Sequence, residues 1–178
     1  MTAAAPPASI EGAVVFTDMV GFTEFTAHQG DEQALALLAM QERLVRDSLP
    51  EDARVVKELG DGLLLWFADA CAALETALTL SGRFEELDEQ SIVPVGVRIG
   101  INWGQYLRRG DDIVGHCVNV ASRIVNVAGP GEVLVSDTVL AEVESRVNGV
   151  EFDELGPVVM KGIPEPVRLF RVYRGQRN

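Results

Sequence analysis

The chain has 178 residues, 47% of them hydrophobic, which is enough for one domain with a substantial core and too short for two. A formal net charge of −12 argues against nonspecific binding to nucleic acid or to an anionic membrane surface, since both carry negative charge. Cys71 and Cys117 form no CxxC pair, so we expect neither a disulfide framework nor a four-ligand zinc site. A reducing, cytoplasmic setting fits this cysteine usage.

Hydrophobic periodicity predicts alternating strands and helices along the chain. The expected elements are a strand at 12–18, a helix at 30–49, strands at 53–59 and 63–68 around a Gly-Asp-Gly turn, a helix at 69–87 and a strand at 94–104. This βαββαβ order is typical of a ferredoxin-like α+β core, an antiparallel sheet with helices packed on one face.

A C-terminal extension follows this core. It is expected to hold a loop at 105–112, a helix at 115–129, a strand at 132–136, a small helix and a closing hairpin within 157–173. We expect one domain over residues 11–174, with short tails at 1–10 and 175–178. The first residues lack the pattern of a signal peptide, and no apolar run approaches the length that crosses a bilayer.

Two carboxylates stand where strands end. Asp18 closes the first strand, and Asp61 lies in the turn of the following hairpin. In a βαββ arrangement the first strand can lie beside that hairpin, which would bring the two acids together. Paired carboxylates repel unless a cation lies between them, and Mg²⁺ or Mn²⁺ takes one or two carboxylates plus phosphate oxygens. A helix cap for Asp18 and an ordinary turn residue for Asp61 are the alternatives.

Basic side chains occur on strand faces that are otherwise bare or apolar. On the strand at 94–104 one face is apolar, whereas the other carries Arg98 among glycines, which indicates close approach of a ligand or of another backbone, or else a bulge. On the strand at 53–59, Lys57 shares its predicted face with Val55 and Leu59, where it is either functional or simply extended to solvent.

The predicted helix at 115–129 carries Asn119 and Arg123 four residues apart, and therefore on one face. An arginine beside an amide on one helical stripe can bind phosphate and ribose oxygens. A solvated or ion-paired arginine is the ordinary alternative.

Five segments together resemble the catalytic domain of class III nucleotidyl cyclases. They are FTDMVGFT, VKELGDGLLLWF, VRIGINWG, DDIVGHCVNVASR and VVMKG, which occur in this order over residues 12 to 173. The resemblance implies a bacterial homodimeric adenylate cyclase that converts ATP to 3′,5′-cyclic AMP and pyrophosphate.

The resemblance also implies a metal and phosphate site. Asp18 and Asp61 would bind two Mg²⁺ or Mn²⁺ ions, with the backbone carbonyl of Met19 as a further ligand. Arg98 and Lys161 match the residues that contact the phosphates of the substrate.

The remaining matched residues would act on the base, the ribose and the α-phosphate. Lys57 and Asp112 match the pair that selects adenine, because a donor and an acceptor complement N1 and the N6 amino group. Asn119 matches the residue that positions the ribose, and Arg123 matches the one that stabilises charge in the transition state.

The family further implies a head-to-tail homodimer with two shared sites. One chain would supply Asp18, Asp61 and Arg98 to each site, and its partner the other matched residues. Lys57 and Asp112 argue against a guanylate cyclase. The intact Asp18, Asp61, Asn119 and Arg123 argue against a silent nucleotide-binding or dimerisation module. The segment QYLRRGDD is shorter than the dimerisation arm of many members of this family.

Overall fold

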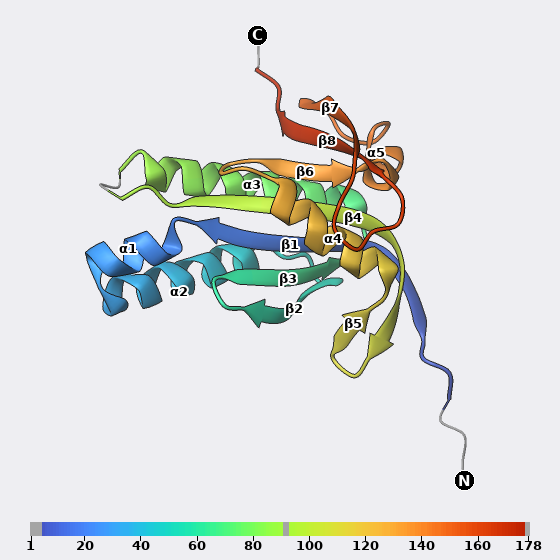
Figure 1. Ribbon diagram of the computed structural model, residues 1–178, viewed down its shortest axis with the longest axis horizontal. Helices are drawn as coiled ribbons and strands as arrows, with labels where there is room; N and C mark the ends of the chain where they lie inside the picture. Colours follow the sequence, from blue (N-terminus) through green and yellow to red (C-terminus); the bar gives the residue numbers. More distant parts are fainter. Residues whose placement is uncertain (1–4, 91–92, 177–178) are drawn as a thin grey trace.

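The computed structural model describes residues 5–90 and 93–176, and in them one sheet is combined with helices (Figure 1). The strands are β1 (Ser9–Val20), β2 (Ala53–Leu59), β3 (Gly62–Phe67), β4 (Gly96–Arg109), β5 (Asp112–Val114), β6 (Val133–Ser136), β7 (Val150–Val158) and β8 (Val167–Arg174). The helices are α1 (Phe22–Gln29), α2 (Asp31–Ser48), α3 (Ala70–Asp88), α4 (His116–Val127) and α5 (Asp137–Val143). None of the described helices is long and apolar enough to cross a membrane. The mixed α+β class is as predicted.

The sheet has the order β2-β3-β1-β4-β6-β8-β7, with β5 paired to β4 at one end. β1 and β4 form its centre, and their antiparallel pairing runs from Ser9 opposite Leu107 to Val20 opposite Gly96. The first four strands are antiparallel, as expected, but β6 joins β4 in parallel. A parallel neighbour requires a crossover, and α4 provides it by running over the sheet between β4 and β6 (Figure 1).

Helices cover both faces of the sheet. The larger apolar cluster joins one face of β1, β3 and β4 to α2, α3 and α5, and Val97, Ile99 and Ile101 lie in it as the alternation predicts. Residues of α2 and α3 share this cluster, so the two helices lie on the same face of the sheet. On the opposite face α4 packs with Val14, Leu64 and other side chains in two smaller clusters.

Two local expectations are wrong. Residues 105–109 are not loop, because β4 continues to Arg109, turns at Gly110 with φ 61° and returns as β5. The start of β1 pairs with this continuation of β4, so the last residues of the expected tail at 1–10 belong to a strand. Residues 1–4 of that tail lie outside the described part of the chain. A separate helix, α1, also occurs between β1 and α2. The strand at 105–109 depends on a distant pairing partner, which local sequence does not show.

The bare face of β4 receives the backbone of α4. A Cβ atom added to Gly100 would lie 2.4 Å from the amide nitrogen of Val125, and one on Gly104 would lie 2.4 Å from Cys117 Sγ. Between these glycines, Asn102 donates from Nδ2 to the carbonyl of Cys117 at 3.0 Å. The backbone of α4 therefore explains Gly100, and the Cys117 side chain of the same helix explains Gly104, so neither glycine requires a ligand.

Gly100→Ala is expected to destabilise the fold by about 1–3 kcal/mol, because the added methyl group meets the backbone of α4 and the helix has to move. Gly82→Ala is the matched control, since Gly82 lies within α3 with nothing within 4 Å of the added atom. That control should be neutral or stabilising by up to about 1 kcal/mol. Urea unfolding measures both variants. Equal stability of the two would contradict the close contact between α4 and β4.

Candidate active site

Asp18 and Arg98 face one another across the central strand pair. They are directly opposite in the β1–β4 register, and Asp18 Oδ2 accepts from Arg98 Nε at 2.9 Å and from Nη2 at 2.5 Å. The side chains remain 30% and 25% exposed, so the pair can still be reached by a ligand. Both lie on the face that carries α4, and Arg98 Nη1 also donates to the carbonyl of Asn126 at 3.4 Å.

The β2–β3 hairpin brings Asp61 to this pair. Gly60 has φ 65° and forms a tight turn with Asp61, and Gly62 then passes so close to β1 that an added Cβ atom would lie 2.2 Å from the carbonyl oxygen of Thr17. The hydroxyl of Thr17 fixes this approach by accepting from the amide of Leu63 at 3.0 Å. The two acids thus lie together, as the topology predicts.

The environment of Asp61 is unfavourable for a second negative charge. Burial raises the pKa of the Asp61 carboxyl, and the charge of Asp18 and a hydrogen bond with that residue raise it further. The guanidinium of Arg98 opposes the shift but does not cancel it. A pocket of about 260 Å³ between α2 and the hairpin adds Glu42 and Glu58 to the lining that includes Asp61. This acidic corner favours a bound cation.

The carboxylates of Asp18 and Asp61 fit a metal ion that takes most of its ligands from water and substrate rather than from the protein. Among the residues that the structure describes, no group of three or more His, Cys, Asp or Glu side chains could hold a metal by itself. Asp18 and Asp61 are hard oxygen ligands that would be completed by water and phosphate oxygens, which is how Mg²⁺ is usually bound. The Met19 carbonyl follows Asp18 in β1, and its role as a further ligand stays a prediction.

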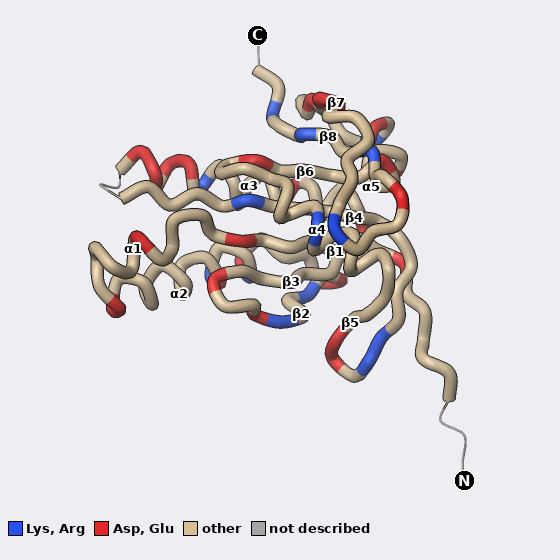
Figure 2. The backbone as a smooth tube through the Cα atoms, viewed as in Figure 1, with Lys and Arg blue, Asp and Glu red and all other residues tan. Residues whose placement is uncertain are grey.

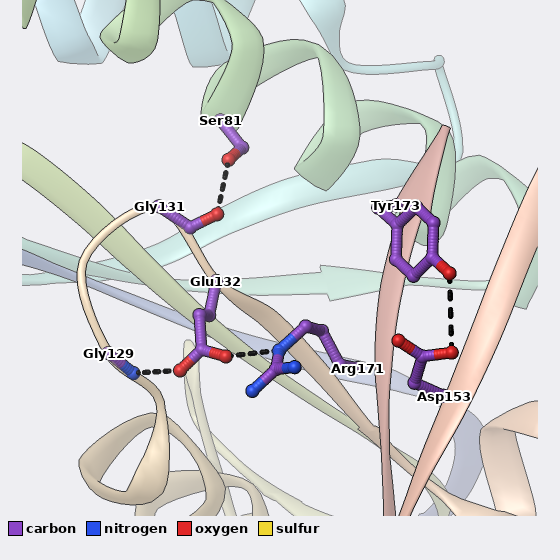
Figure 3. Close-up of polar contacts among 7 residues, drawn as sticks. All are labelled: Ser81, Gly129, Gly131, Glu132, Asp153, Arg171 and Tyr173. Atoms are coloured by element: carbon purple, nitrogen blue, oxygen red, sulfur yellow. Dashed lines mark hydrogen bonds and ion pairs between the residues drawn. The ribbon is translucent and has the colours of Figure 1, made fainter. Parts of the chain in front are cut away.

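The segment after α4 holds the end of that helix beside Arg98. Glu132 accepts from the amide of Gly129 at 2.7 Å and pairs through its other oxygen with Arg171, as Figure 3 shows. Ser81 of α3 donates to the carbonyl of Gly131 at 3.2 Å. These contacts fix the chain just beyond Asn126, whose carbonyl Arg98 binds. The roles of Arg171 and Ser81 could not be predicted from the sequence, because both residues are distant in the chain from the groups that they bind.

Lys57 and Asp112 form an ion pair at the edge of the sheet. Lys57 Nζ lies 2.9 Å from Asp112 Oδ2, and the side chains are 44% and 38% exposed. The hydrogen bond from Lys57 lowers the pKa of the Asp112 carboxyl. The alternation predicted that Lys57 lies on the same face as Val55, and this prediction is wrong. A bulge shifts the β2–β3 register between the two residues, so they lie on opposite faces. The correction puts Lys57 opposite Leu64, on the α4 side of the sheet.

Asn119, Arg123 and Lys161 lack side-chain partners in the described part of the chain. α4 directs Val120 and Ile124 toward the sheet, whereas Asn119 is exposed and Arg123 is partly exposed. Lys161 is exposed in the connection between β7 and β8, directly after Met160, which packs in the same cluster as the buried side of α4. A free amide and two free cations on this side suit a polyanionic ligand.

The predicted residues therefore form separate groups. One joins Asp18, Asp61 and Arg98, and a second joins Lys57 to Asp112. Within residues 5–90 and 93–176, no hydrogen bond or ion pair connects either group to the side chains of Asn119 or Arg123. The matching charges are present in one chain, but its own contacts do not assemble them around one ligand.

The sequence matches a family model described as the adenylate and guanylate cyclase catalytic domain over residues 7–173. It is 34% identical over 171 residues to a pH-sensitive adenylate cyclase of Mycobacterium tuberculosis (strain CDC 1551 / Oshkosh), an alignment covering 95% of this chain and 42% of that protein. An adenylate cyclase of Streptomyces griseus is 32% identical, with coverage of 88% and 38%. The chain thus spans less than half the length of these curated relatives.

A similar fold occurs in the crystal structure of the adenylyl cyclase CyaB from P. aeruginosa. The TM-score is 0.86, the sequence identity is 23%, and the match covers 97% of this chain and 98% of that one. At this level of identity the likeness shows a common fold.

Asp61→Asn is expected to raise the free energy of unfolding at pH 7 by up to about 1 kcal/mol, because it removes a charge that partial burial and the neighbouring Asp18 both disfavour. The measurement is made with a chelator present, so that no metal ion masks the effect. The sign follows from linkage. The folded state binds the Asp61 proton more tightly than the unfolded state does, so wild-type stability falls as the pH rises through the raised pKa.

The advantage of the Asp61→Asn variant should therefore shrink as the pH falls from the raised pKa toward the ordinary pKa of aspartate, and it should be absent below that ordinary pKa. Asp52→Asn, at an exposed turn position before β2, is the control and should show no such advantage. Urea midpoints between pH 3 and pH 8 would test this, and a variant less stable than wild type at pH 7 would contradict the raised pKa.

Proposed function

The chain belongs to the adenylate and guanylate cyclase catalytic domain family, and we propose that it is an adenylate cyclase that converts ATP to 3′,5′-cyclic AMP and pyrophosphate. The observation that carries this proposal is the meeting of Asp18 and Asp61 beside Arg98 at the centre of the sheet. Two acids and an arginine in partial contact with solvent suit a metal-bound triphosphate.

The choice of ATP rests on Lys57 and Asp112. An ammonium group can donate to N1 of adenine, and a carboxylate can accept from its N6 amino group. Guanine presents a donor at N1 and an acceptor at O6, so the same pair opposes it. The 2.9 Å ion pair holds the two side chains together before substrate binds, which supports a joint role. A guanylate cyclase is the alternative function.

Asp18 and Asp61, with the Met19 carbonyl, are the proposed ligands of two Mg²⁺ or Mn²⁺ ions. When bound, such ions make the ribose hydroxyl more acidic and neutralise charge on the triphosphate. Asp18 is also held by Arg98, which fixes its orientation in β1.

The chain's other residues would bind and orient the substrate. Arg98 and Lys161 contact the phosphates, and Asn119 positions the ribose. The ribose 3′-hydroxyl releases its proton, ultimately to solvent, as its oxygen attacks the α-phosphorus. The bond from that phosphorus to the oxygen bridging to the β-phosphate breaks, and pyrophosphate leaves. Arg123 stabilises the charge that develops on the α-phosphate in the transition state.

The separation of the charged groups supports a homodimer with two shared sites. One chain would supply Asp18, Asp61 and Arg98, and the other would supply Lys57, Asp112 and the residues of α4 and the β7–β8 connection. A head-to-tail twofold arrangement completes both sites at once, because each chain carries both sets.

The ferredoxin-like core and the cytoplasmic location belong to the same proposal. The order β2-β3-β1-β4, with α2 and α3 on one face, supports such a core. The use of ATP and the free thiols of Cys71 and Cys117 fit the cytoplasm.

The wild-type protein should form cyclic AMP from ATP with Mg²⁺ or Mn²⁺, and much less cyclic GMP from GTP, with each product identified by mass. Asp18→Ala and Asp61→Ala should each reduce turnover by at least about a hundredfold, because the metal loses a carboxylate ligand. Asp52→Ala is the control and should remain active. Failure of the wild type to form either cyclic nucleotide would leave a silent nucleotide-binding module.

Mixing two inactive variants tests the shared site. Asp18→Ala and Arg123→Ala should each be nearly inactive alone, because every site carries a defect. After subunit exchange, a mixed dimer has one intact site and one with both defects. With random pairing about half of the dimers are mixed, so recovery is limited to about a quarter of wild-type activity. No recovery, although labelled subunits exchange, would place both residues in the site of one chain.

A further inference from the structure

Arg54 binds the same hairpin as Lys57 and has no role in the site described above. Its Nη1 donates to the carbonyl of Asp111 at 2.9 Å, one residue before the carboxylate that Lys57 contacts. Two neighbouring contacts thus join β2 to the start of β5, and they come from residues three apart on a strand.

The bulge in β2 makes this double contact possible. In a regular strand, residues three apart point to opposite faces. The register shift between Val55 and Lys57 instead places Arg54 opposite Trp66 and Lys57 opposite Leu64. Trp66 and Leu64 belong to the apolar cluster on the α4 side, so Arg54 and Lys57 lie on that same side.

The β4–β5 hairpin has few other attachments near Asp112. β5 has three residues, pairs with β4, and is anchored by Ile113, which is 2% exposed in the cluster with Tyr106. In Figure 2 the hairpin extends away from the sheet, with basic residues at the end of β4 and acidic residues at the start of β5. Because an exposed ion pair contributes little by itself, the Lys57 contact alone would restrain Asp112 weakly.

The bond from Arg54 is to backbone, so it restrains the chain and not only a side chain. It fixes the carbonyl of Asp111, and Asp112 is then presented to Lys57 at the correct distance. Arg54 Nη2 is buried and has no hydrogen-bond partner among the described residues, so the guanidinium acts through Nη1. A lysine at this position retains one such donor.

We propose that Arg54 is a positioning residue for base selection: by binding the Asp111 carbonyl it holds Asp112 and Lys57 in the geometry that distinguishes adenine from guanine. This inference rests on the proposed function. It adds a residue that acts through the base-selecting pair without contacting the nucleotide itself.

Arg54→Met keeps much of the apolar stem and removes the donor. It should lower the ratio of kcat/KM for ATP to that for GTP about tenfold, or about 1.4 kcal/mol, chiefly through a higher KM for ATP with kcat changed less than about twofold. Arg54→Lys should keep most of the ratio. Arg83→Met is the matched control, because Arg83 is an exposed arginine of α3 paired with Glu86.

A double-mutant cycle separates positioning from general damage. If Arg54 acts through Asp112, then Arg54→Met should change the ATP to GTP ratio little once Asp112→Asn is present. A loss that is equally large in both backgrounds would overturn the proposal. If Arg54→Met does not fold, Arg54→Leu replaces it, because leucine also lacks a hydrogen-bond donor.

A measurement without turnover keeps this inference apart from the proposed function. Lys57 and the Ile113 amide lower the pKa of the Asp112 carboxyl, with a smaller contribution from Arg109. NMR titration should show that pKa rising toward its usual value in folded Arg54→Met but not in Arg54→Lys. An unchanged pKa and an unchanged ratio in the folded Met variant would overturn the role of Arg54. A wild type without cyclase activity would instead overturn the proposed function, and the titration would still decide whether Arg54 holds Asp112.

Discussion

The close contact between β4 and the backbone of α4 is the constraint on which the site depends. Gly100 and Gly104 leave room for the helix, and the polar residues between and beside them bind its carbonyls, Asn102 at Cys117 and Arg98 at Asn126. The helix is thereby fixed at both ends with its apolar side on the sheet. Its outer side then carries Asn119 and Arg123, while Arg98 is left to face Asp18.

The charge distribution explains why one chain presents a site that is only partly assembled. The two acids near Arg98 leave an excess of negative charge, which a cation would neutralise. Arg123 and Lys161 have free cationic groups within the described residues, which an anion would neutralise. Under the proposed function a metal–triphosphate complex supplies both charges, and a second chain brings the two sets together despite a net charge of −12.

Base selection depends on geometry that begins in β2. The bulge turns Arg54 and Lys57 to one side of the sheet, where one binds backbone and the other a carboxylate of the same short hairpin. A single inserted residue thus changes which side chains act together. The N-terminal strand supports the same region, because it pairs with the continuation of β4 from which the hairpin turns back.

The sequence by itself determined the order of most strands and helices, the apolar face of β4, and which side chains match each position of the expected site. It did so because hydrophobic period and turn residues are local signals. It also predicted that Asp18 and Asp61 would meet, since in a βαββ arrangement the hairpin can lie beside the first strand. Only the tertiary structure decided the extension of β4 to Arg109, the face of Lys57 and the part played by α4 in leaving the β4 face bare. These features depend on a distant pairing partner, a register shift and the approach of another backbone, and none of these has a period that a local pattern can reveal.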